Sequence, residues 1–125
     1  MTITGQVPAK KNNKRIVYNK KTNRPFIISS DRALDWKEYA HYQLKAQPHP
    51  QLDCDAYIKM VFFNKDRRRH DLDNMGATVL DFLVEEKVIE DDNCERLSNL
   101  LLQYGGVDKD NPRVEISITE VERRK

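Results

Sequence analysis

The middle of the chain changes from a strand pattern to a helix pattern across one charged loop, and this change constrains the fold most. Within residues 52–63 every second side chain on one face is apolar, which predicts a half-buried β-strand. Within residues 74–86 the apolar positions recur three and four residues apart, which predicts a helix with one apolar face. The two apolar sets are Cys54, Ala56, Ile58, Met60 and Phe62, then Met75, Val79, Phe82 and Leu83. A strand followed directly by a helix indicates a mixed α+β chain.

The N-terminal third predicts a short strand, a hairpin and a first helix. Residues 2–7 fit a strand, and residues 15–28 fit a β-hairpin whose polar tip carries two lysines. A helix follows, capped by Ser29 or Ser30 and extending to about residue 46. Its apolar stripe consists of Trp36, Ala40 and Leu44.

The C-terminal third predicts two further strands. Residues 97–104 fit the first strand, which Gly105 and Gly106 are expected to end. A turn at residues 108–112 leads to a last strand, in which Val114, Ile116 and Ile118 alternate with polar residues. Residues 1–125, at 14.7 kDa, are enough for a single domain with one modest core. The predicted fold is therefore α+β, a mixed sheet of about four strands with two main helices packed on it.

Composition excludes a membrane-spanning protein and bears on the compartment. The chain is 38% hydrophobic and 34% charged, and no apolar run approaches the roughly 20 residues needed to cross a bilayer. Cys54 and Cys94 match no metal-binding or redox spacing. Free thiols of this kind are typical of a reducing compartment, so we expect a cytoplasmic protein.

Charge is strongly segregated along the chain, although the net charge is only +2. Residues 1–24 contain seven lysines and arginines and no acid, whereas residues 81–95 contain seven acids and one lysine. The segment 65–69 is again basic. A basic arm with a second basic segment is typical of a nucleic-acid-binding protein. The alternative is that these side chains only solvate the surface.

Residues 67–74, RRRHDLDN, set three arginines against the carboxylates of Asp71 and Asp73. Arginines bind phosphate, whereas clustered carboxylates repel it unless a divalent cation lies between them. The run therefore indicates a metal-dependent enzyme acting on a phosphodiester, or else a solvated charged loop that opens a helix. An extended segment would project both carboxylates to one side, whereas Asp73 alone is better explained as an N-cap. Asp92 lies beyond the predicted helix and can join them only through tertiary packing.

Three motifs in this order resemble the central signature of RusA-type Holliday-junction resolvases. They are DLDN at residues 71–74, LDFL at residues 80–83 and VIEDD at residues 88–92. Pro8 with the two asparagines that follow it, and the segment 113–118, also sit where that family has similar elements. The resemblance covers essentially the whole chain. The series with these gaps is fairly specific, whereas DLDN alone would be weak.

The resemblance implies an Mg²⁺-dependent endodeoxyribonuclease, with Mn²⁺ as an alternative ion, that resolves four-way DNA junctions by paired symmetric nicks in recombination and repair. It also implies a homodimer, often encoded by phages and prophages and associated with the nucleoid. Asp71, Asp73 and Asp92 match the family's three essential carboxylates, which hold the metal and carry the catalysis. The DNA-binding residues expected from the basic segments are Lys10, Lys11, Lys14, Arg15, Lys20, Lys21, Arg67, Arg68 and Arg69.

One departure from the family bears on activity. The family usually has a lysine three residues after the asparagine of DLDN, and this chain has Ala77 there. Candidates for a substitute cation are Lys65, Lys87 and His70. His70 beside two acids can also be a metal ligand, but a solvated or ion-paired side chain is the better explanation. Three hypotheses therefore stand. They are an active structure-selective endonuclease, a junction- or duplex-binding protein with weak or lost nuclease activity, and an interaction domain without metal.

Overall fold

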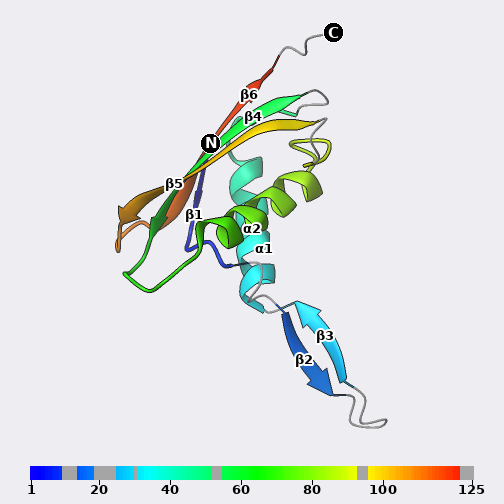
Figure 1. Cartoon of the computed structure of the whole chain (residues 1–125), viewed down its shortest axis with the longest axis vertical. Helices are drawn as coiled ribbons and strands as arrows, with labels where there is room; N and C mark the ends of the chain where they lie inside the picture. Colours follow the sequence, from blue (N-terminus) through cyan, green and yellow to red (C-terminus); the bar gives the residue numbers. More distant parts are fainter. Residues whose placement is uncertain (10–13, 19–24, 30, 52–54, 93–95, 122–125) are drawn as a thin grey trace.

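The computed structural model of the chain describes residues 1–9, 14–18, 25–29, 31–51, 55–92 and 96–121 (Figure 1). The elements are β1 (Thr2–Thr4), β2 (Lys14–Tyr18), β3 (Pro25–Ser29), α1 (Asp31–Lys45), β4 (Ala56–Asn64), α2 (Leu72–Glu85), β5 (Leu97–Val107) and β6 (Arg113–Glu120). Four strands form one sheet in the order β1-β6-β4-β5, and β2 pairs with β3 separately. The predicted α+β class, with a four-stranded sheet and two helices, is confirmed. Within the described part of the chain, neither helix has the length and hydrophobicity to cross a membrane.

The sheet is mixed because β4 pairs in parallel with β5 and antiparallel with β6. In the parallel pair Ala56 lies opposite Leu97, and Asn64 lies opposite Val107. A parallel pair needs a crossover connection, and α2 supplies it. The residues that follow β4 therefore lie at one end of the sheet, and the residues that precede β5 lie at the other.

The core lies between the sheet and the two helices, which Figure 1 shows on the same side of the sheet. Burial alternates along β4 as its period of two predicts, with every second residue from Ala56 to Asn64 buried. Trp36 of α1 meets Phe82 of α2 edge to face, with ring centroids 5.4 Å apart. Burial of each large apolar side chain stabilises the fold by about 1.5–3 kcal/mol. The predicted core residues that are buried are Trp36, Ala40, Leu44, Ala56, Ile58, Met60, Phe62, Met75, Val79, Phe82, Leu83, Val114 and Ile116.

The predicted break at Gly105 and Gly106 is wrong, because β5 continues through both glycines to Val107. A Cβ on Gly105 would lie 2.7 Å from ring atoms of Phe63 on the neighbouring strand, so only glycine fits beside that ring. Gly106 has a φ of +114°, and the pairing register shifts between Phe62 and Phe63. The two glycines therefore accommodate a β-bulge within the strand.

Other predicted boundaries shift by a few residues. β1 ends at Thr4, because Gly5 turns the chain with a φ of +106°. α2 begins at Leu72, two residues before the predicted start. Some predictions concern residues outside the described part of the chain. They are those for Cys54, Cys94, Ser30 and the hairpin tip 19–23.

The predicted hairpin is confirmed as the antiparallel pair β2–β3, with Lys14 opposite Ser29 and Tyr18 opposite Pro25. Figure 1 shows it projecting away from the sheet, beyond the N-terminal end of α1. Of the predicted DNA-binding residues, Lys14 and Arg15 lie on β2. Lys10, Lys11, Lys20 and Lys21 lie outside the described residues.

Candidate active site

The chain enters α2 through what we call the acidic corner, formed by Asp71 and Asp73. Asp71 is the N-cap residue, with an extended backbone (φ −88°, ψ 126°), and Asp73 lies in the first turn. Both residues are exposed, and their negative charge is favourable beside the positive end of the helix dipole. The carboxylate of Asp71 makes no capping hydrogen bond to the backbone. The prediction that Asp73 is the N-cap is wrong, because Asp71 occupies that position.

Asn74 holds the acidic corner together. Its side-chain amide Nδ2 donates to Oδ2 of Asp71 at 3.3 Å, and its backbone N–H donates to Oδ1 of Asp73 at 2.9 Å. Asn74 is only 8% exposed, so surrounding atoms limit its movement. The helix begins at Leu72, so extended-strand geometry does not align the two carboxylates. Asn74 is the residue that links them.

The N-terminal segment anchors the loop that follows β4. The side-chain amide of Gln6 donates to Oδ1 of Asn64 at 3.1 Å and accepts from the backbone N–H of Lys65 at 2.8 Å. The hydroxyl of Thr78 donates to the carbonyl oxygen of Pro8 at 2.7 Å, which fastens the same segment to α2. Asn64 and Gln6 are 58 residues apart, and no local pattern in the sequence identifies them as partners.

Three exposed arginines lie on this loop, directly before the acidic corner. They are Arg67, Arg68 and Arg69. The side chain of Arg68 is 79% exposed, and its Nε lies 3.6 Å from Oδ2 of Asp66. An exposed pair at this distance contributes little and leaves the guanidinium available to another anion. The loop therefore presents positive charge next to the two carboxylates.

His70 faces Asp66 rather than the acidic corner. Its Nε2 lies 3.9 Å from Oδ1 of Asp66, and its side chain is 20% exposed. At 3.9 Å the contact is too long for a hydrogen bond, so Nε2 remains without a partner, and His70 belongs to no group of three possible metal ligands among the described residues.

Asp92 lies toward the opposite end of the sheet from the acidic corner, as the register of β5 on β4 requires. It precedes Leu97, which pairs with the beginning of β4, whereas the acidic corner follows the end of β4. The 14 residues of α2 separate the two places, a distance of about 21 Å along the helix. Among the described residues, no three His, Cys, Asp or Glu side chains come together to hold a metal ion. One chain therefore brings Asp71 and Asp73 together, but not Asp92.

Ala77 lies half-buried in α2, one turn after Asp73. Of the candidate substitute cations, Lys65 and His70 lie on the loop that leads into the acidic corner. Lys87 follows the C-terminal end of α2, with a φ of 59°, and therefore lies on the side of Asp92. Within one chain, a cation near the acidic corner has to come from the loop.

β5 is an edge strand with an apolar surface. It is the last strand in the sheet order, so one of its sides has no neighbour among the described strands. Four of its large apolar side chains are 41–50% exposed, namely Leu100, Leu101, Tyr104 and Val107. A long exposed edge strand is a ready template for pairing with another chain. This edge is therefore a surface that a partner can cover.

The acidic corner fits a hard divalent cation. Mg²⁺ is usually bound by one or two carboxylates together with water and substrate phosphate oxygens. The hydrogen bonds from Asn74 occupy one oxygen of Asp71 and one of Asp73, which leaves further lone pairs on both exposed carboxylates. Two carboxylates beside an arginine-rich loop thus suit an ion that is shared with a phosphate.

Comparison with known protein families gives a match over most of the chain. A sequence model of the endodeoxyribonuclease RusA family matches residues 6–119, which is nearly the whole chain. No curated protein matches. The matched segment contains the acidic corner, the arginine-rich loop and the edge strand β5.

Proposed function

Because the chain belongs to the RusA family of endodeoxyribonucleases, which act on Holliday junctions, we propose that it resolves four-way DNA junctions by paired nicks. The observation that carries this proposal is the acidic corner placed directly after a loop with three exposed arginines. Arginines attract a phosphodiester, and the carboxylates can hold the cation that makes it reactive. Neither group alone would favour phosphodiester hydrolysis.

We infer dependence on Mg²⁺, with Mn²⁺ as a substitute, from the same residues. Asp71 and Asp73 would hold the ion through the oxygens that Asn74 leaves free. When bound, the ion supplies Lewis-acid stabilisation of the phosphate and an activated water. The chain itself contributes position, since Asn74 fixes the carboxylates and the arginines orient the phosphate for in-line attack.

The basic segments would hold the junction arms through their phosphates. The arginines of the loop lie next to the acidic corner, and the hairpin carries Lys14 and Arg15 away from it. Contacts of this kind release counterions, so junction binding should weaken steeply as the salt concentration rises.

The separation of Asp92 from the acidic corner supports a homodimer with shared active sites. Two copies that pair their β5 edges antiparallel about a two-fold axis would form one continuous sheet. The start of one β5 would then face the end of the other. The start of β5 follows Asp92, and its end lies beside the loop that leads to the acidic corner. Asp92 of the partner subunit would therefore approach Asp71 and Asp73.

Ala77 favours a second candidate function, junction binding with weak or lost cleavage. A cation at this position, one turn into α2, would lie beside the acidic corner and stabilise charge on the phosphate. Alanine provides none. The two functions predict the same binding and differ only in turnover.

Cleavage of a labelled synthetic four-way junction in Mg²⁺ tests the proposal. We expect symmetric nicks on the junction and none on a linear duplex. Asp73→Asn and Asp92→Asn should each lower the rate more than about 100-fold, because even residues that only support metal ligands cost 10- to 100-fold. Asp91→Asn is the matched control and should cleave normally. Tight junction binding by the unaltered chain without product, in Mg²⁺ and in Mn²⁺, would favour the binding protein.

A further inference from the structure

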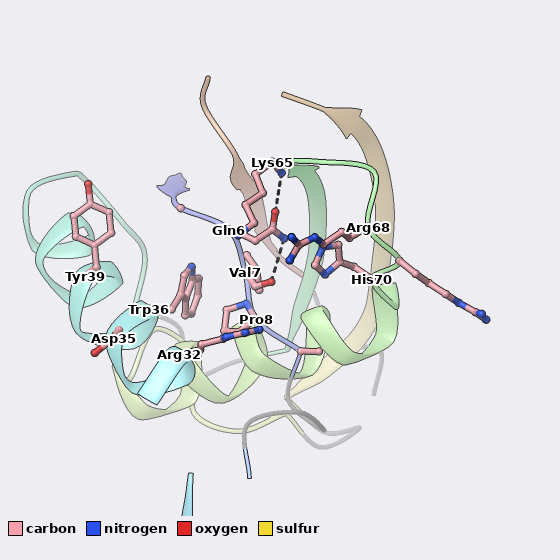
Figure 2. A pocket seen from close by; sticks show the side chains of 13 residues that line it. Gln6, Val7, Pro8, Arg32, Asp35, Trp36, Tyr39, Lys65, Arg68 and His70 are labelled. Atoms are coloured by element: carbon pink, nitrogen blue, oxygen red, sulfur yellow. Dashed lines mark hydrogen bonds between the residues drawn. The ribbon is translucent and has the colours of Figure 1, made fainter. Parts of the chain in front are cut away.

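A hollow of about 640 Å³ lies between the N-terminal segment, α1 and the loop after β4 (Figure 2). Residues 5–9 line its middle. Arg32, Trp36 and Tyr39 line it from α1, and Lys65, Arg68 and His70 line it from the loop. A volume of this size is typical of sites for small organic ligands. The hollow adjoins the acidic corner, because the loop that lines it continues into Asp71.

The hollow is suited to an anion. Figure 2 shows the guanidinium groups of Arg32 and Arg68 directed toward the N-terminal segment from opposite walls. Lys65 adds a third cation from the loop. Asp35 is the one acid among the described residues that line the hollow, and Figure 2 shows its carboxylate directed away from it. A phosphate group inside would therefore be bound from two sides.

The α1 wall of the hollow is aromatic. Positions 32, 36 and 39 lie four and three residues apart, so their side chains share one face of the helix. Gly5 lies opposite, where a Cβ would be 3.8 Å from Cδ1 of Trp36 and 3.9 Å from Cδ1 of Tyr39. A Cβ at this position would be in van der Waals contact with both rings, so the glycine leaves room beside them. Tyr39 is 56% exposed, whereas Trp36 is 5% exposed.

Unused hydrogen-bonding groups gather at the same place. Across the described residues, three buried side-chain polar atoms have no hydrogen-bond partner, and two of them belong to residues that line this hollow. They are Nε1 of Trp36 and Nε2 of His70. Buried polar atoms in folded proteins almost always have a partner. Two such atoms beside one hollow indicate that a polar ligand completes it.

We propose that the hollow binds one unpaired nucleotide of the DNA substrate. Its phosphate lies between Arg32 and Arg68, and its base packs against Tyr39 and accepts the indole N–H of Trp36. A base inside a duplex is stacked and paired, and it cannot reach an aromatic wall without leaving the helix. Unpaired bases stack on aromatic side chains irrespective of sequence. The inference rests on the proposed function, because a nucleotide held here would set which neighbouring phosphodiester meets the acidic corner.

Tryptophan fluorescence of the full chain tests this inference, because Trp36 is the one tryptophan in the sequence. A thymidine tetranucleotide added in EDTA should change the emission in a saturable way. A blunt-ended duplex long enough to remain fully paired should cause no change at the same concentrations. Inorganic phosphate and thymidine monophosphate serve as competitors, and both should bind more weakly than the tetranucleotide. If inorganic phosphate competed as well as the tetranucleotide, the hollow would be a simple anion site. If thymidine monophosphate competed as well, the hollow would be a site for free nucleotides. Either result would overturn the inference.

Variants locate the binding. Tyr39→Ala and Arg32→Ala should each weaken tetranucleotide binding by roughly 10-fold, as expected for loss of a stacking or phosphate contact. Tyr42→Ala and Lys45→Ala, exposed residues of the same helix outside the hollow, should leave it unchanged. Unaltered binding by Tyr39→Ala would overturn the inference.

The Asp73→Asn variant separates this inference from the proposed function. It should keep tetranucleotide binding while junction cleavage is lost. Cleavage by the unaltered chain without tetranucleotide binding would contradict the hollow alone. Tetranucleotide binding without cleavage would contradict the proposed function alone.

Discussion

At the scale of single residues, Asn74 does most to define the candidate site. Its side chain and backbone bind one carboxylate each, and its low exposure keeps that geometry in place before any ion or DNA arrives. Pre-organised ligands of this kind lower the cost of binding. Ala77 has the opposite effect, because it leaves any positive charge near the carboxylates to the loop. The balance between these two residues decides whether the site cleaves well.

Asp108 pairs with Arg113 at the end of the sheet, near the loop that follows β4. This pair predicts a pH-dependent contribution to stability. Nη1 of Arg113 donates to Oδ2 of Asp108 at 2.7 Å, and this hydrogen bond holds the pKa of Asp108 below its ordinary value. A carboxylate whose pKa is lowered on folding stabilises the protein above its unfolded pKa and loses this effect as the pH falls through its folded pKa. Asp108→Asn should therefore lower Tm at neutral pH, by a margin that shrinks below about pH 4. Calorimetry of both proteins across this range measures the margin, and a margin that grows on acidification would contradict the account.

At the scale of elements, periodic segments were predictable from the sequence and the glycine pair was not. The alternation of β4 and the apolar stripes of both helices follow from geometry that every residue of an element shares, so local pattern suffices. Gly105 and Gly106 carry a strong local turn signal. Their real constraint is the ring of Phe63 on the adjacent strand, which no neighbouring position in the sequence reveals. Sheet context therefore overrides turn propensity at this point.

Phe82 provides a test of how the two helices pack, because its ring joins α2 to α1 through the ring of Trp36. It is 1% exposed, so Phe82→Ala should lower the free energy of unfolding by about 3–5 kcal/mol. Leu34→Ala removes a side chain that is 55% exposed on α1 and should change it by no more than about 0.5 kcal/mol. Urea unfolding followed by circular dichroism compares the two variants. Similar losses in both would show that the core between the helices is not where the structure places it.

At the scale of the whole molecule, the parallel pairing of β4 with β5 decides which carboxylates one chain can bring together. Asp71 and Asp73 were predictable as neighbours because only Leu72 lies between them. The position of Asp92 was not predictable, because its spacing from Asp73 in the sequence does not determine at which end of the sheet it lies. The register of β5 on β4 places Asp92 at the far end. A second copy related by a two-fold axis is the simplest way to reunite the three.

The edge of β5 should hold that second copy. Leu101 lies next to the midpoint of the strand and is 42% exposed. Leu101→Glu would bring two like charges together near the axis and remove apolar contact, so dimer affinity should fall by about 10-fold or more. Leu34→Glu introduces the same charge on α1 and should leave the dimer intact. Light scattering at micromolar concentration reads out both, and an unaltered dimeric mass for Leu101→Glu would place the interface elsewhere.

Mixed dimers of two inactive variants test most directly whether each active site draws carboxylates from both chains. In a dimer of one Asp71→Asn chain and one Asp92→Asn chain, one site would combine the intact Asp71 of one chain with the intact Asp92 of the other. The second site would lack both. We predict that mixing the two inactive variants restores nicking of a single strand of the four-way junction. A mixture that stays inactive, although differently tagged subunits are shown to exchange, would contradict the shared site.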